Sequence, residues 1–189
     1  MAASTVAGRW PERVDGEWNV DMLGNLPDDG LRYEIIDGVL RVSPSPVPVH
    51  QRALLRLAVL LMAGCPPGHE VFVAPLDWQP DHRTSLEPDV MVVPRTAIGP
   101  RNIPGTPLLV VEVASPATAR IDRLLKFSRY AEGGISQYWI VNPSVQSIEV
   151  FDLIAGSYQL VAGARGKEPL RISQPLAVTL TPAGLIADS

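Results

Sequence analysis

The chain has 189 residues, of which 46% are hydrophobic, and its 16 Lys and Arg against 20 Asp and Glu give a formal net charge of −4. This length suits one domain with a substantial core, and no apolar run reaches the roughly 18 to 20 residues of a membrane span. A lone Cys65 excludes an internal disulfide framework and a cysteine metal cluster. Residues 1–13 lack the charged start and apolar block of a secretory signal, so we expect a cytoplasmic protein with no membrane contact.

The acidic balance also bears on nucleic acids. Neutralised phosphates supply most of the affinity of a non-specific DNA binder, so a net negative chain is a poor candidate for holding long duplex DNA. Basic residues do gather in one segment, which contains Arg120, Arg123, Lys126 and Arg129. A nucleic-acid enzyme with a local basic surface is therefore compatible with the composition.

The first half of the chain opens with a polar stretch. Residues 1–29 are rich in turn formers and are expected to form an N-terminal extension. Asp37-Gly38 separates two apolar stretches and predicts a β-hairpin, because both turn residues accept positive φ. Prolines at 44, 46 and 48 predict an extended linker over 43–49. Residues 50–64 are apolar nearly all round, which predicts a helix buried against a sheet or a partner subunit.

The second half is predicted to alternate strands with one long helix. Expected strands cover Glu70–Ala74, Leu76–Trp78, Asp89–Val93, Leu108–Val113, Gln137–Val141, Ser147–Leu153 and Tyr158–Ala162. The run 108–113 is almost continuously apolar, as in a central strand covered on both faces. Ser115-Pro116 predicts a helix start, with Ser as N-cap, and Gly133-Gly134 predicts its end. The last two strands are expected to form a hairpin, and residues 163–189 are weakly patterned.

Two carboxylates stand where strands are predicted. Glu112 lies inside the apolar run, and a charge buried there must be paired or bind a cation. An arginine ion pair and a metal site are the two alternatives. Asp89 stands at the mouth of its own strand, where it either caps a turn or joins Glu112 in one site.

The helix after Glu112 offers a cation. Asp122, Lys126 and Tyr130 recur at i, i+4 and i+8 and share one helix face, so Lys126 could return towards Glu112. The alternative is an ordinary surface ion pair between Asp122 and Lys126. Two carboxylates suit Mg²⁺ or Mn²⁺, which prefer oxygen ligands. A nearby ammonium could orient or activate water, or stabilise charge on a phosphate.

Other polar and aromatic residues leave their roles open. His50 opens the first helix and could be a cap, a core contact or a substrate contact. Tyr138 and Trp139 belong to a buried strand and are expected in the core. Tyr130 either packs beneath the sheet or supports the lysine or a phosphate through its hydroxyl.

Taken together, several of these segments resemble a known family. The resemblance is carried by Glu87–Val90, Val111–Thr118, the spaced Asp122, Lys126 and Tyr130, and Gly133–Pro143, with Tyr33-Glu34, Asp37-Gly38 and His50 also matching. These residues resemble the Uma-two family of restriction-endonuclease-like proteins, in the PD-(D/E)XK nuclease superfamily. The resemblance covers roughly residues 30–155 and is specific as a combination.

The resemblance implies an α/β restriction-endonuclease-like fold, with a mixed central β-sheet flanked by helices and an additional β-hairpin region. Residues 30–162 would form the nuclease-like domain, and 163–189 would pack on it. The implied site contains Asp89, Glu112 and Lys126, with Glu34 in support and the Val113 carbonyl as a further metal ligand.

This sequence departs from the pattern in two places. The superfamily usually has a lysine two residues after the carboxylate, where this chain has Ala114, so its role is expected to pass to Lys126. Asn142 stands where the family more often has Asp.

The implied activity is a Mg²⁺- or Mn²⁺-dependent endonuclease acting on nucleic acid, with DNA as the expected substrate. The alternative is an inactive module of the same fold that binds DNA or assembles proteins. The apolar helix also predicts a homodimer, unless that helix is sandwiched within a monomer.

Overall fold

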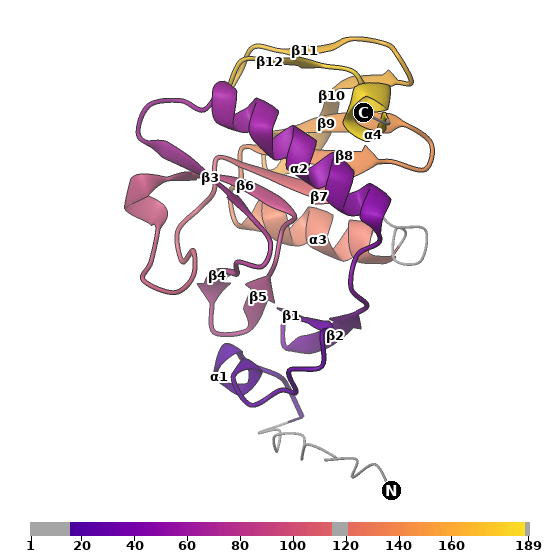
Figure 1. Ribbon diagram of the computed structural model, residues 1–189. Coiled ribbons are helices and arrows are strands. Elements are labelled where there is room, and N and C mark those ends of the chain that lie inside the picture. Colours follow the sequence, from indigo (N-terminus) through magenta and orange to yellow (C-terminus); the bar gives the residue numbers. More distant parts are fainter. Residues whose placement is uncertain (1–15, 115–120, 188–189) are drawn as a thin grey trace, which may run out of the picture.

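The computed structural model describes residues 16–114 and 121–187. Its centre is a mixed six-stranded sheet with the strand order β10-β9-β8-β7-β6-β3 (Figure 1). Strands β7 and β8 run parallel, and every other pair in this sheet is antiparallel. The six strands are β3 (His69–Val73), β6 (Val90–Pro94), β7 (Leu109–Val113), β8 (Gln137–Asn142), β9 (Ser147–Ile154) and β10 (Ser157–Arg165). The predicted mixed α/β architecture is therefore present.

A second sheet of four strands, ordered β2-β1-β5-β4, carries the predicted hairpin. Its strands are β1 (Arg32–Ile36), β2 (Val39–Ser43), β4 (Trp78–Asp81) and β5 (Thr84–Leu86). Asp37 and Gly38 form the turn with φ of 50° and 82°, so the hairpin prediction is confirmed. The strand predicted over 76–78 is wrong in its extent, since β4 begins only at Trp78.

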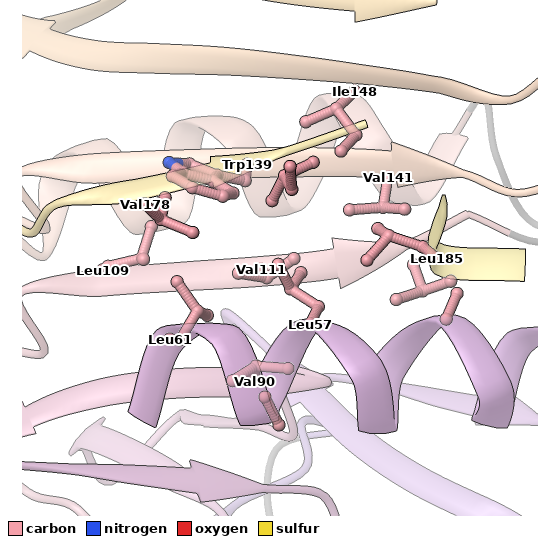
Figure 2. Close-up of a cluster of buried hydrophobic side chains, with 14 of the residues drawn as sticks. Leu57, Leu61, Val90, Leu109, Val111, Trp139, Val141, Ile148, Val178 and Leu185 are labelled. Atoms are coloured by element: carbon pink, nitrogen blue, oxygen red, sulfur yellow. The ribbon is translucent and has the colours of Figure 1, made fainter. Parts of the chain in front are cut away.

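Helix α2 (Pro48–Ala63) covers one face of the large sheet. It starts two residues before the predicted position, because proline fits the first turn of a helix without losing a needed hydrogen bond. Leu57 and Leu61 point from α2 towards Val111 and other core residues of the sheet (Figure 2). The prediction of a helix buried against a sheet is therefore confirmed, while Leu55, Val59 and Met62 on another side of α2 are exposed.

Helix α3 (Ile121–Glu132) lies on the other face of the sheet. Its Tyr130 packs with Tyr138 of β8, with ring centroids 5.3 Å apart. The predicted stop is confirmed, since Gly134 adopts a φ of 72° directly after the helix. The predicted start at Ser115 lies outside the described residues.

The remaining elements surround this three-layer arrangement. They are α1 (Val20–Leu23), the short 3₁₀ helix η1 (Arg95–Ala97), β11 (Leu170–Ile172), β12 (Val178–Leu180) and α4 (Pro182–Ile186). Helix α4 is tied to α2 because Arg56 donates to the carbonyl of Ala187 at 2.6 Å. The last part of the chain thus packs on the same core. Within the described residues, no helix is both long and apolar enough to cross a membrane.

Candidate active site

The register of β6 and β7 brings Asp89 and Glu112 to one place. Val90 pairs with Val111 in this antiparallel ladder, so one further step sets Asp89 opposite Glu112. Opposed residues on neighbouring strands have Cβ atoms about 4.5 to 5.5 Å apart. Both carboxylates line the same cavity. The two carboxylates are therefore close enough for the charge of Asp89 to raise the pKa of Glu112.

Asp89 is held by three other residues. Its Oδ2 accepts a hydrogen bond from the Val113 amide at 2.7 Å and lies 3.2 Å from His50 Nε2. Its Oδ1 lies 3.3 Å from each terminal nitrogen of Arg32. The side chain is almost completely buried, with 1% of its surface exposed. The negative charge of Asp89 therefore has partners at both oxygens inside the fold, as burial requires.

Glu112 is paired with Lys126. The lysine Nζ lies 3.0 Å from Glu112 Oε1 and 2.8 Å from Glu34 Oε1. Tyr130 donates its hydroxyl hydrogen to the same Glu112 oxygen at 2.6 Å. Glu34 in turn accepts the backbone N–H of Glu87 at 3.0 Å. One buried ammonium thus bridges two carboxylates from β1 and β7.

A cavity of about 570 Å³ opens over these groups. Its lining includes Arg32, Glu34, Asp89, Glu112 and Lys126, together with His50. It also includes the segment 43–49 that leads into α2 and the turn 142–147 that joins β8 to β9. Two further charged residues, Glu149 and Arg165, line the same cavity.

The surroundings shift the pKa values of the two carboxylates in opposite directions. Burial raises the pKa of Asp89, but the hydrogen bond from His50 and the charge of Arg32 outweigh it and bring the pKa below the usual value. Burial also raises the pKa of Glu112, and there the nearby Lys126 only partly offsets the effect of burial and of Asp89. A divalent cation between these two groups would relieve their mutual repulsion.

Lys126 stays charged in this setting. Burial alone would lower its pKa, but Glu112 and Glu34 raise it above the ordinary lysine value. A lysine with a raised pKa cannot take a proton from water near neutral pH. Its chemical value is as a fixed positive charge and hydrogen-bond donor.

The donor set suits a hard cation that keeps part of its water. Within residues 16–114 and 121–187, no group of three His, Cys, Asp or Glu side chains forms a ready metal cage. Mg²⁺ does not need one, because it commonly uses one or two carboxylates and retains several waters. Asp89 and Glu112 can supply these carboxylates, and the Val113 carbonyl belongs to the residue whose N–H already binds Asp89.

The structure resolves several alternatives left open by the sequence. Among the residues that the structure describes, Glu112 forms its ion pair with Lys126 and not with an arginine. Lys126 is 5% exposed and bonded to Glu34 and Glu112, which excludes a solvent-exposed surface ion pair as its main role. Tyr130 is fully buried in the core, and its hydroxyl binds Glu112, the carboxylate that is paired with Lys126.

The roles of other predicted residues also become clear. Tyr138 and Trp139 are core residues, as predicted. His50 does not cap α2 through its side chain; it contacts Asp89 instead. Asn142 accepts the amide of Ser144 at 3.1 Å and so shapes the turn beside the cavity. Ala114 lines the cavity but offers no charged group.

The sequence analysis assigned no role in the site to Arg32, which lines the cavity, or to its partner Glu87. Arg32 bonds Asp89 and lies 3.3 Å from Glu87. Burial raises the pKa of Glu87 to about 7, even though Arg32 opposes this. The alternation of side chains along a strand places residues i and i+2 on one face, so Arg32 could have been inferred from its spacing to Glu34.

Comparisons with known proteins agree with this architecture. The profile of the Uma2 family, described as "Putative restriction endonuclease", matches residues 20–183. A crystal structure described as a putative nuclease belonging to DUF820 from Anabaena variabilis superposes with a TM-score of 0.70 at 17% identity, covering 89% of this chain and 97% of that one. The comparison with curated proteins found no match. The structural match confirms the predicted restriction-endonuclease-like fold.

Proposed function

The chain belongs to the Uma2 family, and from that premise we propose that it is a nuclease, a Mg²⁺- or Mn²⁺-dependent endonuclease that hydrolyses phosphodiester bonds in nucleic acid, with DNA as the expected substrate. One observation carries the proposal. The buried ammonium of Lys126 lies 3.0 Å from Glu112 in a cavity that also contains Asp89. Two carboxylates beside a fixed cation, in a cavity open to a ligand, suit metal-assisted hydrolysis of a phosphate ester.

The residues divide the work by their chemistry. Asp89 and Glu112, with the Val113 carbonyl, would hold the metal ion. The bound ion would supply Lewis-acid activation of water and phosphate. Lys126 would stabilise the charge that grows on the phosphate oxygens, since its raised pKa leaves it protonated. Glu34 would keep the Lys126 ammonium in place from the far side, 2.8 Å away.

The surface of α2 supports a second element of the proposal, a homodimer. Leu55, Val59 and Met62 are 64%, 58% and 64% exposed and follow one another along the helix. The neighbouring groove is lined by α2, β12 and α4. Exposed apolar surface of this kind marks interaction sites, and a second copy of the chain is the partner we propose. Such a surface would also serve an inactive module that assembles proteins, which is the competing function.

A metal titration tests the proposed site without relying on activity. Mn²⁺ that binds the folded state must raise the melting temperature as its concentration increases. We expect this rise in the wild-type protein and its loss in Asp89→Asn. Asp28→Asn, at an exposed position, is the matched control and should respond like the wild type. A melting temperature independent of Mn²⁺ in the wild type would contradict the metal-dependent function.

A further inference from the structure

His50 joins two features that the proposed mechanism does not use. It lies in the first turn of α2, is 7% exposed and lines the active-site cavity. Its Nε2 lies 3.2 Å from Asp89 Oδ2. Its other ring nitrogen, Nδ1, is buried and has no hydrogen-bond partner among the described residues. A buried polar atom without a partner lowers the stability of the fold by about 1 to 3 kcal/mol. A histidine at this position is therefore not explained by packing alone.

The two oxygens of Asp89 are treated unequally. Oδ2 receives hydrogen from Val113 N at 2.7 Å and from the imidazole of His50, which together occupy its lone pairs. Among the described residues, Oδ1 has the two longer contacts of 3.3 Å to Arg32, whose side chain is partly exposed. The carboxylate is therefore fixed in rotation through Oδ2, and Oδ1 is the oxygen that a metal ion could bind by replacing the longer contacts to Arg32. Arg32 supplies the positive charge at Oδ1 in this arrangement.

We propose that His50 is a positioning residue for the metal site: its Nε2–H fixes Asp89 through Oδ2, so that Oδ1 faces the cavity as the metal-binding oxygen. The proposal rests on the proposed function, because it concerns the same site. It also assigns a reason for placing α2 directly after the proline-rich segment, since the first turn of the helix delivers the imidazole to Asp89. Partners that orient a metal-binding carboxylate contribute about 10- to 100-fold to metal affinity in comparable sites.

Two amide variants separate the roles of the two ring nitrogens. The side-chain NH₂ of glutamine is separated from Cβ by the same number of bonds as Nε2 of histidine. His50→Gln can therefore still donate a hydrogen bond to Asp89. His50→Asn carries the NH₂ one bond closer, near the place of Nδ1, and cannot reach. His50→Ala removes both groups. Free Mn²⁺ is the probe, and its dissociation constant is measured by electron paramagnetic resonance on the folded proteins.

We expect His50→Gln to bind Mn²⁺ within about threefold of the wild type, and His50→Asn and His50→Ala to bind at least about tenfold more weakly. Urea unfolding of each variant provides the second readout. A purely structural histidine would lower stability in all three variants and leave the dissociation constant unchanged, which would overturn the proposal. Equal weakening in the Gln and Asn variants would overturn it as well.

The controls keep this proposal distinct from the proposed function. Wild-type protein that binds Mn²⁺ together with unaltered binding in His50→Ala contradicts the role of His50 alone. Wild-type protein that binds no Mn²⁺ contradicts the metal-dependent function and the positioning role with it. His69→Gln, at a histidine whose ring lies 3.2 Å from the Pro67 carbonyl and does not line the active-site cavity, should bind Mn²⁺ like the wild type.

Discussion

The Nζ of Lys126 lies 3.0 Å from Oε1 of Glu112, although Glu112 is on a central strand and Lys126 is on the helix that follows. Ala114, two residues after Glu112 on the same strand end, offers no charged group. A turn of α3 thus brings an ammonium to the carboxylate from a different element. This relationship links the fold to the proposed chemistry, and the first prediction follows from it.

Lys126→Ala should destabilise the protein by about 3 to 5 kcal/mol, because removing one partner of a buried ion pair leaves uncompensated charge. Here two carboxylates, Glu34 and Glu112, would lose the same ammonium. Urea unfolding measures the effect. Lys167→Ala, at an exposed lysine, is the matched control and should change stability by less than about 0.5 kcal/mol. Equal stability of the two variants would show that the bridge contributes nothing to the fold.

Tyr130→Phe should lower the free energy of unfolding by about 1.5 to 3 kcal/mol, the range for hydrogen bonds to charged groups. The substitution keeps the ring in the core and removes only the donor to Glu112, 2.6 Å away. Tyr33→Phe, whose hydroxyl bonds an exposed aspartate, should cost less. A smaller loss of stability for Tyr130→Phe than for Tyr33→Phe would show that the hydrogen bond to Glu112 does not stabilise the fold as predicted.

Glu87→Gln should change how stability depends on pH in metal-free buffer. Burial raises the pKa of Glu87 from 4.5 to about 7, so its contribution to stability is complete below about pH 4.5 and is lost as the pH rises through about 7. The neutral glutamine has no such loss. As the pH rises between these values, the free energy of unfolding of the variant should therefore increase relative to that of the wild type. At higher pH this difference should stay constant. Parallel curves for variant and wild type would contradict the shifted pKa, and Glu70→Gln, which removes an exposed partner of Arg95, serves as control.

Val59→Asp should convert the proposed dimer into a monomer. The substitution puts a charge in the centre of the exposed apolar side of α2, where burial against a second copy would be costly. Light scattering over a dilution series measures the mass of variant and wild type. Leu124→Asp, at a leucine of α3 that is 70% exposed, is the control and should leave the mass unchanged. A wild-type monomer at every concentration would contradict the dimer.

The sequence was most informative where a charged residue interrupts an apolar strand. Glu112 could be recognised because a carboxylate inside an apolar run requires a partner, and the Asp37-Gly38 turn was readable from local backbone preference. Sequence was less informative at β4 and β5, which are short: β5 pairs with β1, and β4 pairs with β5. Local pattern does not encode which distant segment completes a sheet.

The partners within the site show the same limit. Glu34 and Lys126 are separated by 92 positions and Arg32 and Asp89 by 57. Such contacts arise only when β1, β6, β7 and α3 have been assembled. The helix spacing indicated Lys126 and the family resemblance added Glu34, but neither predicted the contact between His50 and Asp89, which depends on how α2 packs near the start of β6.

Cleavage of a labelled oligonucleotide tests the central claim most directly. The wild-type protein is incubated with single- and double-stranded DNA and with RNA, in Mg²⁺, in Mn²⁺ and in chelator, beside Glu112→Gln and the exposed control Glu132→Gln. Loss of one carboxylate that supports a metal ion should reduce the rate by at least about 100-fold. The account predicts cleavage that requires the metal and is lost in Glu112→Gln but kept in Glu132→Gln. Cleavage that survives chelator, or that Glu112→Gln retains in full, would contradict it.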